Sequence, residues 1–401
     1  METGTQSTEN SAKQRSDYVI RIFDSPQDIA PSSWDYLWAQ QDTPSPFMQH
    51  AYLAALHSSG SASPDTGWSP QFITVWSGDI LVAACPMYLK THSYGEYVFD
   101  WAWAKAYDDH GLNYYPKAVS AVPFTPVPGS RLLAIDSQAR LALLNACIAL
   151  CKYQQLSSLH LLFTSPADRA ACESIGLLQR KTVQFHWNNS GFTSFEEFLA
   201  SLNQEKRKKI KQERRRVAEA GVTFRILQGT EIQGQDWDFF YQCYERTYLE
   251  HGNAPYLTRE FFAHMQRDMA DNWLLFIAVK HQRPIACSLI AVQGLNTPQA
   301  VAYGRYWGAL ERLDCLHFEA CYYQPLQWCI AHGVGRFEGG AQGEHKMARA
   351  LMPVTTYSAH WLAHPAFSNA VARFLDQETT GVEGYMEHLS NRSPYRTKSP
   401  G

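Results

Sequence analysis

The chain has 401 residues, of which 45% are hydrophobic and 18% charged, a composition that excludes a disordered protein and suits about two globular domains. Its 35 basic and 38 acidic residues give a net charge of −3, so no global field attracts nucleic acid and any basic function must be local. Nine scattered cysteines without a C-x-x-C motif argue against a disulfide framework or a zinc finger and fit a reducing compartment.

Neither a signal peptide nor a membrane span is expected. The opening stretch METGTQSTENSAKQRSDYVI is polar and lacks an apolar centre. The longest apolar run, Leu141 to Cys151, is too short to cross a bilayer and is typical of a buried helix. These patterns predict a cytoplasmic protein with no integral membrane segment.

The first half of the chain alternates short strands and helices. Alternation predicts a strand over 18–25, and helical spacing predicts helices over 32–40 and 46–60, the second ended by Gly60. A β-meander with a Ser-Gly-Asp turn is expected over 70–99. The further expected elements are a helix over 140–156, a strand over 158–164, a short helix over 168–176 and a strand over 177–189.

The second half repeats this order of elements. It is expected to contain strands over 221–227, 273–293 (a pair), 299–309, 335–340 and 355–363, with helices over 235–252, 258–272, 314–333 (kinked at Pro325) and 365–378. Neither G-x-G-x-x-G after a strand nor a P-loop is present. The pattern therefore predicts two copies of one α/β fold instead of a doubly wound sheet. The expected division is a disordered tail (1–16), two domains (17–190 and 222–390) joined by a basic helix (191–221), and a flexible tail (391–401).

The basic helix between the halves carries a dense run of cations. Ser194 and Glu197 form a capping-box pattern at its start, and Gly221 suits its end. Its cations are Lys206, Arg207, Lys208, Lys209, Lys211, Arg214, Arg215 and Arg216. One interpretation is a solvated face, with Glu205, Glu213 and Glu219 pairing within the helix. The other is a phosphate-binding surface for a tRNA, a nucleotide or an acidic lipid, formed by Lys206, Arg207, Lys209 and Arg214.

The segment from Tyr303 to Leu362 resembles the C-terminal domain of acyltransferases with the GNAT fold, and more narrowly the FemAB-like proteins and the CelD-type acetyltransferase domain. The segment from His92 to Leu133 resembles the family labelled FemAB-like, or peptidoglycan biosynthesis/recognition. The residues that match the C-terminal pattern are Tyr303, Glu319, Gly339, Gly340, Gly343 and Lys346. The resemblance implies an α/β (α+β) fold of two tandem GNAT-like domains, each with a mixed, mostly antiparallel central sheet flanked by helices.

The resemblance also implies an activity. Fem-type enzymes move an aminoacyl group from aminoacyl-tRNA to an amine of a peptidoglycan precursor, whereas other GNAT proteins move an acetyl group from acetyl-CoA. The usual pyrophosphate loop, Q/R-x-x-G-x-G/A, is absent in its standard form. That departure leaves room for an acyl donor other than acetyl-CoA.

Acyl transfer to an amine needs a base, a group that stabilises the oxyanion, and a cleft that holds both reactants. The stretch RFEGGAQGEHKMARALMP offers candidates for each. Lys346 is expected to stabilise the charged donor or the oxyanion. Glu338 or Glu344 is expected to act as the base, and His345 either to replace that carboxylate as the base or to orient it. The glycines let backbone N–H groups approach a ligand. An ordinary exposed turn remains the alternative.

A second cluster, in the first half, combines aromatic and polar groups. It contains Tyr94, Glu96, Asp100, Trp101, Trp103, Tyr114, Tyr115 and Lys117. Either it forms a substrate-binding groove or it is a core packed with Trp and Tyr. If DWAW is a strand, Asp100 faces away from the tryptophans. Arg131 nearby is either an anion ligand or a surface residue.

No metal site is expected. His360 and His364 have helical metal spacing, but Pro365 and the strand-like sequence before it argue against that geometry. The sequence therefore predicts an N-acyltransferase that moves an acetyl or aminoacyl group directly to an amine, with no permanently bound cofactor and no covalent nucleophile. Acetyl-CoA or aminoacyl-tRNA is the expected donor, and a small molecule or cell-wall precursor the acceptor. The alternative is a non-catalytic protein of the same fold that recognises a cell-wall precursor or a nucleic acid through the basic helix.

Overall fold

The computed structural model describes residues 17–341 and 343–396. The first half contains β1 (Tyr18–Phe23), α1 (Pro31–Ala39), α2 (His50–Ser58), β2 (Trp68–Pro70), β3 (Phe72–Ser77), β4 (Ile80–Cys85), β5 (Met87–Lys90), α3 (Trp101–Asp109), β6 (Lys117–Ser120), β7 (Leu133–Ala134), α4 (Ser137–Tyr153), β8 (Ser158–Leu161), α5 (Pro166–Ser174) and β9 (Leu178–Asn188). Of the meander expected over 70–99, only the hairpin β3–β4 is present, because β5 pairs with β2 and β6 in a different sheet. The predicted tail over 1–16 lies outside the described residues.

The second half begins with two helices and ends with a long one. It contains α6 (Phe195–Ser201), α7 (Gln204–Glu219), β10 (Val222–Gln228), α8 (Gly234–Glu250), α9 (Arg259–Asp268), β11 (Trp273–Lys280), β12 (Arg283–Gln293), β13 (Val301–Ala309), α10 (Leu316–Phe318), the π-helical turn η6 (Glu319–Tyr323), α11 (Gln324–Ala331), β14 (Arg336–Ala341), the 3₁₀ turn η7 (Glu344–Arg349), β15 (Met352–Leu362) and α12 (Pro365–Ser390). Of the predicted tail over 391–401, only 391–396 are described, and Leu202 forms a β-bridge with Tyr395.

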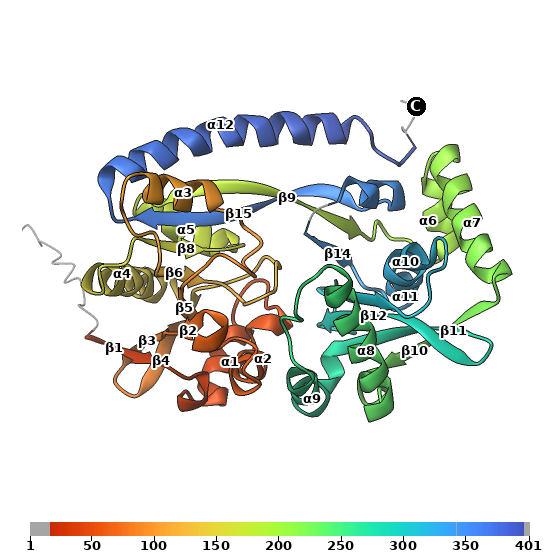
Figure 1. The fold of residues 1–401 in the computed structure, drawn as a ribbon, viewed down its shortest axis with the longest axis horizontal. Helices are drawn as coiled ribbons and strands as arrows, with labels where there is room; N and C mark the ends of the chain where they lie inside the picture. The colour runs from red at the N-terminus through yellow and green to blue at the C-terminus, as the bar shows by residue number, and fades with distance from the viewer. Residues whose placement is uncertain (1–16, 342, 397–401) are drawn as a thin grey trace, which may run out of the picture.

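One large sheet runs through both halves of the molecule (Figure 1). Its 11 strands follow the order β10-β11-β12-β13-β14-β9-β15-β8-β6-β5-β2, and β1, β3, β4 and β7 form a second, four-stranded sheet. Most neighbours are antiparallel, but β13–β14 and β6–β8 are parallel. β9 lies beside β14 of the second half, and β15 lies between β8 and β9. The two halves therefore share strands.

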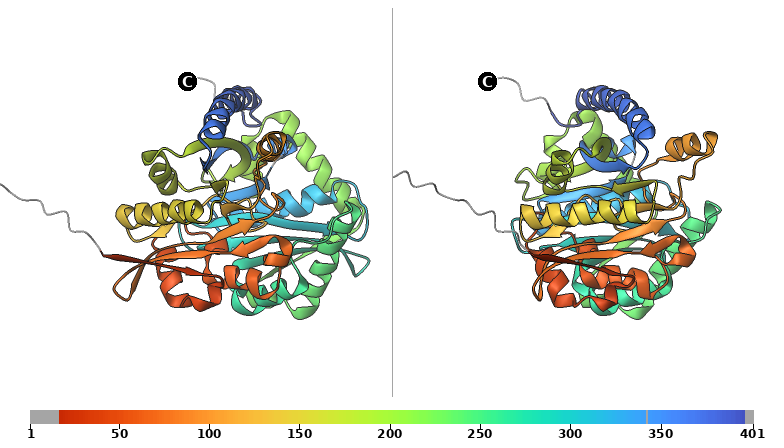
Figure 2. Two further views of the ribbon diagram at one scale, coloured as in Figure 1. Left: turned by 60° about the vertical axis from the view of Figure 1, so that its left-hand side comes forward. Right: turned by 90° about the vertical axis from the view of Figure 1, so that its left-hand side faces the viewer.

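Helices cover both faces of this sheet (Figure 2). The C-terminal helix α12 packs across β9 and β15, at the top of Figure 1. On the other side α2 contacts α9, and α8 packs on β12 and β13. An aromatic core crosses between the halves, since Tyr52 meets Phe261 at 5.2 Å and Phe47 meets Tyr303 at 5.3 Å between ring centroids. The arrangement fixes the two halves against each other.

Two further local expectations from the sequence were wrong, and the helix expected over 314–333 is present but irregular. The basic helix is not continuous, because Leu202 is extended (φ −81°, ψ 154°) and divides it into α6 and α7. Ser194 still caps α6, as expected, by accepting a hydrogen bond from the Glu197 amide. DWAW is not a strand, since Asp100 precedes the first turn of α3. The helix over 314–333 contains the π-helical turn η6 immediately before Pro325, which occupies the first turn of α11.

The parallel pair β13–β14 separates part-way along its length. Pairing runs from Val301–Arg336 to Tyr303–Glu338 and stops there, although both strands continue. Gly339 follows at once, and a Cβ atom there would lie 2.4 Å from Leu351 Cδ2 and 3.0 Å from the Phe185 carbonyl oxygen. Only glycine lets β14 pass so close to β9 and to the chain after η7.

Candidate active site

Two cavities lie on opposite faces of β14, where it separates from β13. Arg336 and Glu338 line one of them, of about 400 Å³, called here the Glu338 cavity. Phe337 and Gly339 line the other, of about 280 Å³, called the Lys346 cavity. This division follows from the alternation of side chains along a strand. A single strand thus contributes to both cavities.

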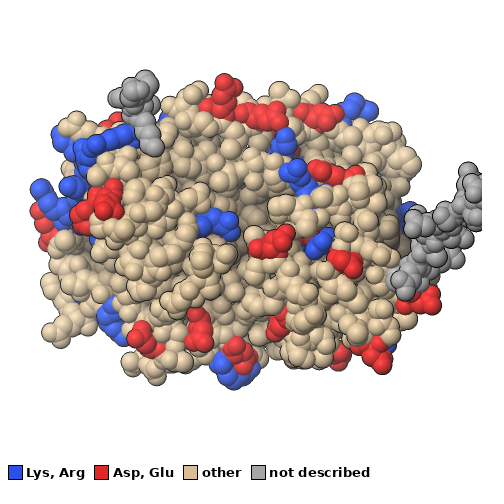
Figure 3. Space-filling view, turned by 180° about the vertical axis from the view of Figure 1, so that it is seen from behind, with Lys and Arg blue, Asp and Glu red and all other residues tan. Residues whose placement is uncertain are grey.

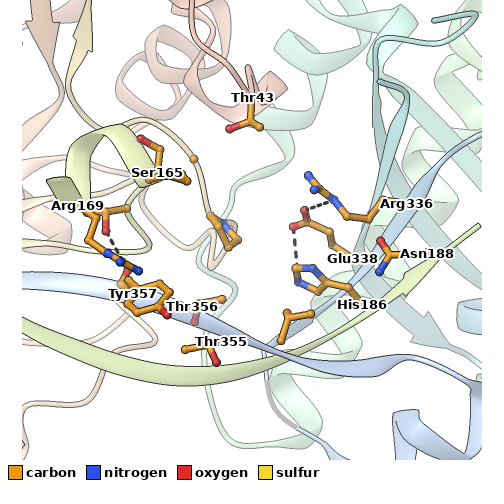
Figure 4. A pocket seen from close by; sticks show the side chains of 15 residues that line it. Thr43, Ser165, Arg169, His186, Asn188, Arg336, Glu338, Thr355, Thr356 and Tyr357 are labelled. Carbon is orange, nitrogen blue, oxygen red and sulfur yellow. Dashed lines mark hydrogen bonds and ion pairs between the residues drawn. The ribbon is translucent and has the colours of Figure 1, made fainter. Parts of the chain in front are cut away.

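The Glu338 cavity holds a buried carboxylate at the junction of the two halves (Figure 4). Oε1 of Glu338 lies 3.0 Å from Nε of Arg336, and Oε2 lies 3.9 Å from Nε2 of His186 on β9. Oε2 accepts no hydrogen bond from the described residues. Burial raises the pKa of Glu338 to about 7, against the attraction of Arg336. This carboxylate can therefore take up a proton near neutral pH.

The surroundings of Glu338 are polar and come from distant parts of the chain. Burial lowers the pKa of His186 to about 3, so the ring is neutral at physiological pH, and its Nε2 lies 3.2 Å from Gln184 Oε1. Across the cavity, the Arg169 guanidinium lies 4.3 Å from the ring centroid of Tyr357 and pairs with Glu173 at 3.0 Å. Figure 4 shows Arg169 and Arg336 on opposite sides. The Glu338 carboxylate therefore lies between two arginines across the cavity.

The Lys346 cavity is enclosed by η6, η7 and β13. Nζ of Lys346 donates to the Gly340 carbonyl oxygen at 3.2 Å, and burial lowers the pKa of Lys346 to about 8. The wall contains Cys321 and Tyr322 of η6, and the Tyr322 hydroxyl lies 3.3 Å from Nε2 of His345. A buried ammonium beside a backbone carbonyl can neutralise a developing negative charge.

The structure separates the residues that the sequence grouped as catalytic. Lys346 and His345 line the Lys346 cavity, and Glu338 lies on the other face of β14. Glu344 lines neither cavity, because its carboxylate accepts from the Tyr385 hydroxyl at 2.9 Å and lies 3.4 Å from Nη1 of Arg392. Of the two carboxylates considered for the base, only Glu338 lines one of these cavities.

The substrate-binding residues predicted in the second half have several environments. Gly339 lines the Lys346 cavity, and Gly340 supplies the carbonyl that Lys346 contacts. Gly343 adopts φ +115° just before η7, a conformation that favours glycine. Tyr303 is buried beside Glu338 in the strand register. Glu319 is also buried, and it accepts hydrogen bonds from Arg214 and Gln324.

The cluster predicted in the first half forms a closed polar network. Lys117 Nζ donates to Glu96 Oε2 at 2.8 Å, to Ser93 Oγ at 2.7 Å and to Asp100. The Tyr114 hydroxyl donates to Asp100 Oδ2 at 2.6 Å. Lys117 is fully buried. Glu96 Oε1 and Asp100 Oδ1 accept no hydrogen bond from the described residues, but the network is buried and does not present an open groove.

The other members of that cluster lie around the network. Tyr115 hydrogen-bonds Ser93 at 2.8 Å, and Trp103 packs edge-on against His360. Tyr94 and Trp101 are exposed, and their ring centroids lie 5.3 Å apart. Arg131 is neither a surface residue nor an available anion ligand, because it is buried and its Nε donates to the Leu162 carbonyl.

The cations of α7 divide into paired and unpaired groups. Lys206 pairs with Glu205 at 3.0 Å, and Arg215 pairs with Glu219 at 3.1 Å. Arg214 faces inward to Glu319, so it is not part of the outer surface expected to bind phosphate. Within the described ranges, no carboxylate lies within 4.0 Å of the cations Arg207, Lys208, Lys209, Lys211 and Arg216. Figure 3 shows Lys and Arg gathered at its left edge, where α6 and α7 lie.

His360 and His364 do not share a site. His360 is buried on β15 with its Nδ1 2.7 Å from Nδ1 of His160, whereas His364 precedes α12. Over 17–341 and 343–396, no group of three or more His, Cys, Asp or Glu residues could hold a metal ion. In the same ranges, no helix combines the length and apolar character that crossing a membrane requires.

A comparison with protein families identifies the chain. The family model for FemAB-like proteins, described as peptidoglycan biosynthesis/recognition, matches residues 25–397. The chain belongs to the FemAB-like family. No curated protein sequence matches it. The resemblance stated from the sequence is thereby confirmed.

Solved structures share this fold at low sequence identity. FemX has a TM-score of 0.54 and 10% identity, over 88% of this chain and 100% of that one. L-PGS from Bacillus licheniformis has a TM-score of 0.52 and 10% identity, over 86% and 97%. The C-terminal domain of a putative lysylphosphatidylglycerol synthetase from Agrobacterium fabrum has a TM-score of 0.51 and 11% identity, over 86% and 95%. The FemAB-like chain therefore has a tandem GNAT-like fold, in which strand sharing joins the two central sheets.

Proposed function

We propose that this FemAB-like protein is an N-acyltransferase that moves an aminoacyl group from an aminoacyl-tRNA to the amine of a cell-wall precursor. The observation that carries the proposal is the placement of Glu338 and Lys346 on opposite faces of β14, beside the point where β13 and β14 separate. Donor and acceptor would approach this point from the two cavities. The family description supports a role in peptidoglycan synthesis.

The reaction would use the two groups in succession. The acceptor amine loses a proton to Glu338 and attacks the carbonyl carbon of the aminoacyl ester. Lys346 stabilises the negative charge that develops on the carbonyl oxygen. The C–O ester bond then breaks, the tRNA hydroxyl leaves with a proton, and an amide remains. The pKa of Glu338, about 7, suits a base that works near neutral pH.

Two observations favour aminoacyl-tRNA over acetyl-CoA as the donor. The sequence lacks the standard pyrophosphate loop, and α7 presents five cations without carboxylate partners among the described residues. One of the similar structures is named as the C-terminal domain of a putative lysylphosphatidylglycerol synthetase, a name that joins an amino acid to a lipid. The protein is proposed to act in the cytoplasm, where aminoacyl-tRNA is made.

The test is transfer of a radiolabelled amino acid from bulk aminoacyl-tRNA to purified cell-wall precursors. Glu338→Gln and Lys346→Met should each lower kcat by about 100-fold or more. Glu344→Gln is the matched control and should keep the wild-type rate, because Glu344 lines neither cavity. Tight binding of tRNA or precursor without any product would instead support a non-catalytic binding protein.

A further inference from the structure

The helix α7 has two faces with different partners. The cations Arg207, Lys208, Lys209, Lys211 and Arg216 have no carboxylate within 4.0 Å among the described residues; Arg207 is half-buried and the other four are exposed. The inner face of α7 sends Glu213 and Arg214 into the second half. Glu213 is 7% exposed and does not pair within its own helix, contrary to the expectation from the sequence. A buried carboxylate in so basic a helix needs a specific partner.

The partner of Glu213 is Arg349, the last residue of η7. Nη2 of Arg349 donates to Oε1 and Oε2 of Glu213 at 2.8 and 3.0 Å. The Tyr323 hydroxyl, at the end of η6, also donates to Glu213. Both Arg349 and Tyr323 are buried. The pair is therefore a buried ion pair in which one guanidinium nitrogen bridges both carboxylate oxygens, and the Tyr323 hydroxyl adds a third hydrogen bond.

Arg349 also contacts the turn η7, which holds Lys346. Its Nη1 donates to the His345 carbonyl oxygen at 2.9 Å, and its Cζ lies 3.5 Å from the ring centroid of Phe318. The same guanidinium thus joins α7 to the backbone immediately before Lys346. The orientation of η7 depends on where α7 holds Arg349.

The neighbouring residue of α7 holds the facing wall of the same cavity. Nε of Arg214 donates to the Glu319 carboxylate at 3.1 and 3.3 Å, and Nη2 donates to Gln327 at 2.8 Å. Glu319 begins η6, whose Cys321 and Tyr322 line the Lys346 cavity. Two adjacent residues of α7 therefore hold both η6 and η7. The π-helical form of η6 is itself frequent at functional sites.

We propose that Glu213 is a positioning residue, which through Arg349 holds η7 and Lys346 in place for the acyl donor and so links polyanion docking on α7 to the Lys346 cavity. This inference rests on the proposed function for the identity of the donor. Phosphates that bind the outer cations would act on the same rigid helix whose inner face sets the cavity wall. Docking of the nucleic acid and placement of its acyl end are then parts of one event.

The test compares Glu213→Gln with Glu219→Gln, a control on the same helix whose carboxylate is exposed and pairs only with Arg215. Glu213→Gln should lower kcat about 10- to 100-fold, as expected for a displaced catalytic group, and leave the KM for aminoacyl-tRNA within about twofold. Lys208→Gln/Lys211→Gln should do the reverse, raising KM and preserving kcat. A wild-type kcat in a folded Glu213→Gln protein would overturn the inference.

A second readout does not depend on activity. The pH midpoint of acetic-anhydride labelling at Lys346, measured by mass spectrometry, should rise toward the ordinary lysine value in Glu213→Gln and stay unchanged in Glu219→Gln. The titratable groups facing Lys346 are Cys321 on η6, His317 on α10, His345 and Arg349 on η7, and His186 on β9. None of these residues is substituted in either variant.

The two readouts separate the two hypotheses. If the wild type transfers nothing but the labelling midpoint moves only in Glu213→Gln, the link stands and the proposed function fails. If the wild type is active and neither kcat nor the midpoint changes, the link fails. Tyr323→Phe, which removes only the hydroxyl at Glu213, serves if Glu213→Gln does not fold, and it should move both readouts in the same direction by a smaller amount.

Discussion

Replacement of Glu338 by Gln should stabilise the protein above neutral pH while it removes activity. Glu338 is buried, and folding raises its pKa from 4.5 to about 7, a shift that already includes the attraction of Arg336. Ionised Glu338 therefore weakens the folded state by about 3 kcal/mol, whereas Gln stays neutral at every pH. Below pH 4.5 the carboxyl is protonated in both states and this penalty is absent.

The assay is urea unfolding followed by tryptophan fluorescence from pH 4.5 to 8.5. The difference in unfolding free energy between Glu338→Gln and wild type should be near zero at the lowest pH, grow through pH 7, and reach about 3 kcal/mol above it. Glu344→Gln, which removes an exposed carboxylate, should show no such growth. A difference that is flat with pH, or that favours the wild type at pH 8, would refute the assignment of Glu338 as a desolvated base.

Three further outcomes are expected. Lys117→Met should cost about 3–5 kcal/mol in a thermal or urea melt, because it leaves Glu96 and Asp100 buried without their cation, while Lys105→Met, at an exposed position of α3, should leave the midpoint unchanged. The pH profile of kcat/KM should be bell-shaped, rising near pH 7 as Glu338 ionises and falling near pH 8 as Lys346 loses its proton; a plateau to pH 10 would contradict it. Replacing Arg207, Lys208 and Lys211 by Gln should weaken tRNA binding and make the log–log salt dependence shallower by about 0.7–0.9 per lost phosphate contact, as measured by fluorescence anisotropy.

Local signals in the sequence were sufficient for much of the fold. Ser194 caps α6 as its capping-box pattern predicts, and alternation correctly indicated β15. Side-chain direction was harder to predict. In the sequence, Glu213 and Arg214 stand in a continuous polar segment that does not indicate which side chains are buried. The packing of α7 against η6 and η7 shows that both face inward.

Long-range pairing explains what the sequence could not predict about the site. His186 and Asn188 reach Glu338 because β9 pairs with β14, more than a hundred residues later in the chain. In the first half, Glu96, Asp100 and Lys117 form a closed network. An open groove would contain the same residue types, so the sequence alone could not distinguish the two. The predicted domain boundaries at 190 and 222 stay a prediction.

The exchange of β9 and β15 has a consequence for biosynthesis. β8 needs β15 as its neighbour, and β15 ends at Leu362, near the C-terminal end of the described chain. As the polypeptide leaves the ribosome, the edge of β8 stays unpaired until β15 has been synthesised. Neither half can then be expressed alone with a complete sheet, and a stop codon anywhere before β15 leaves an aggregation-prone edge instead of a smaller folded protein.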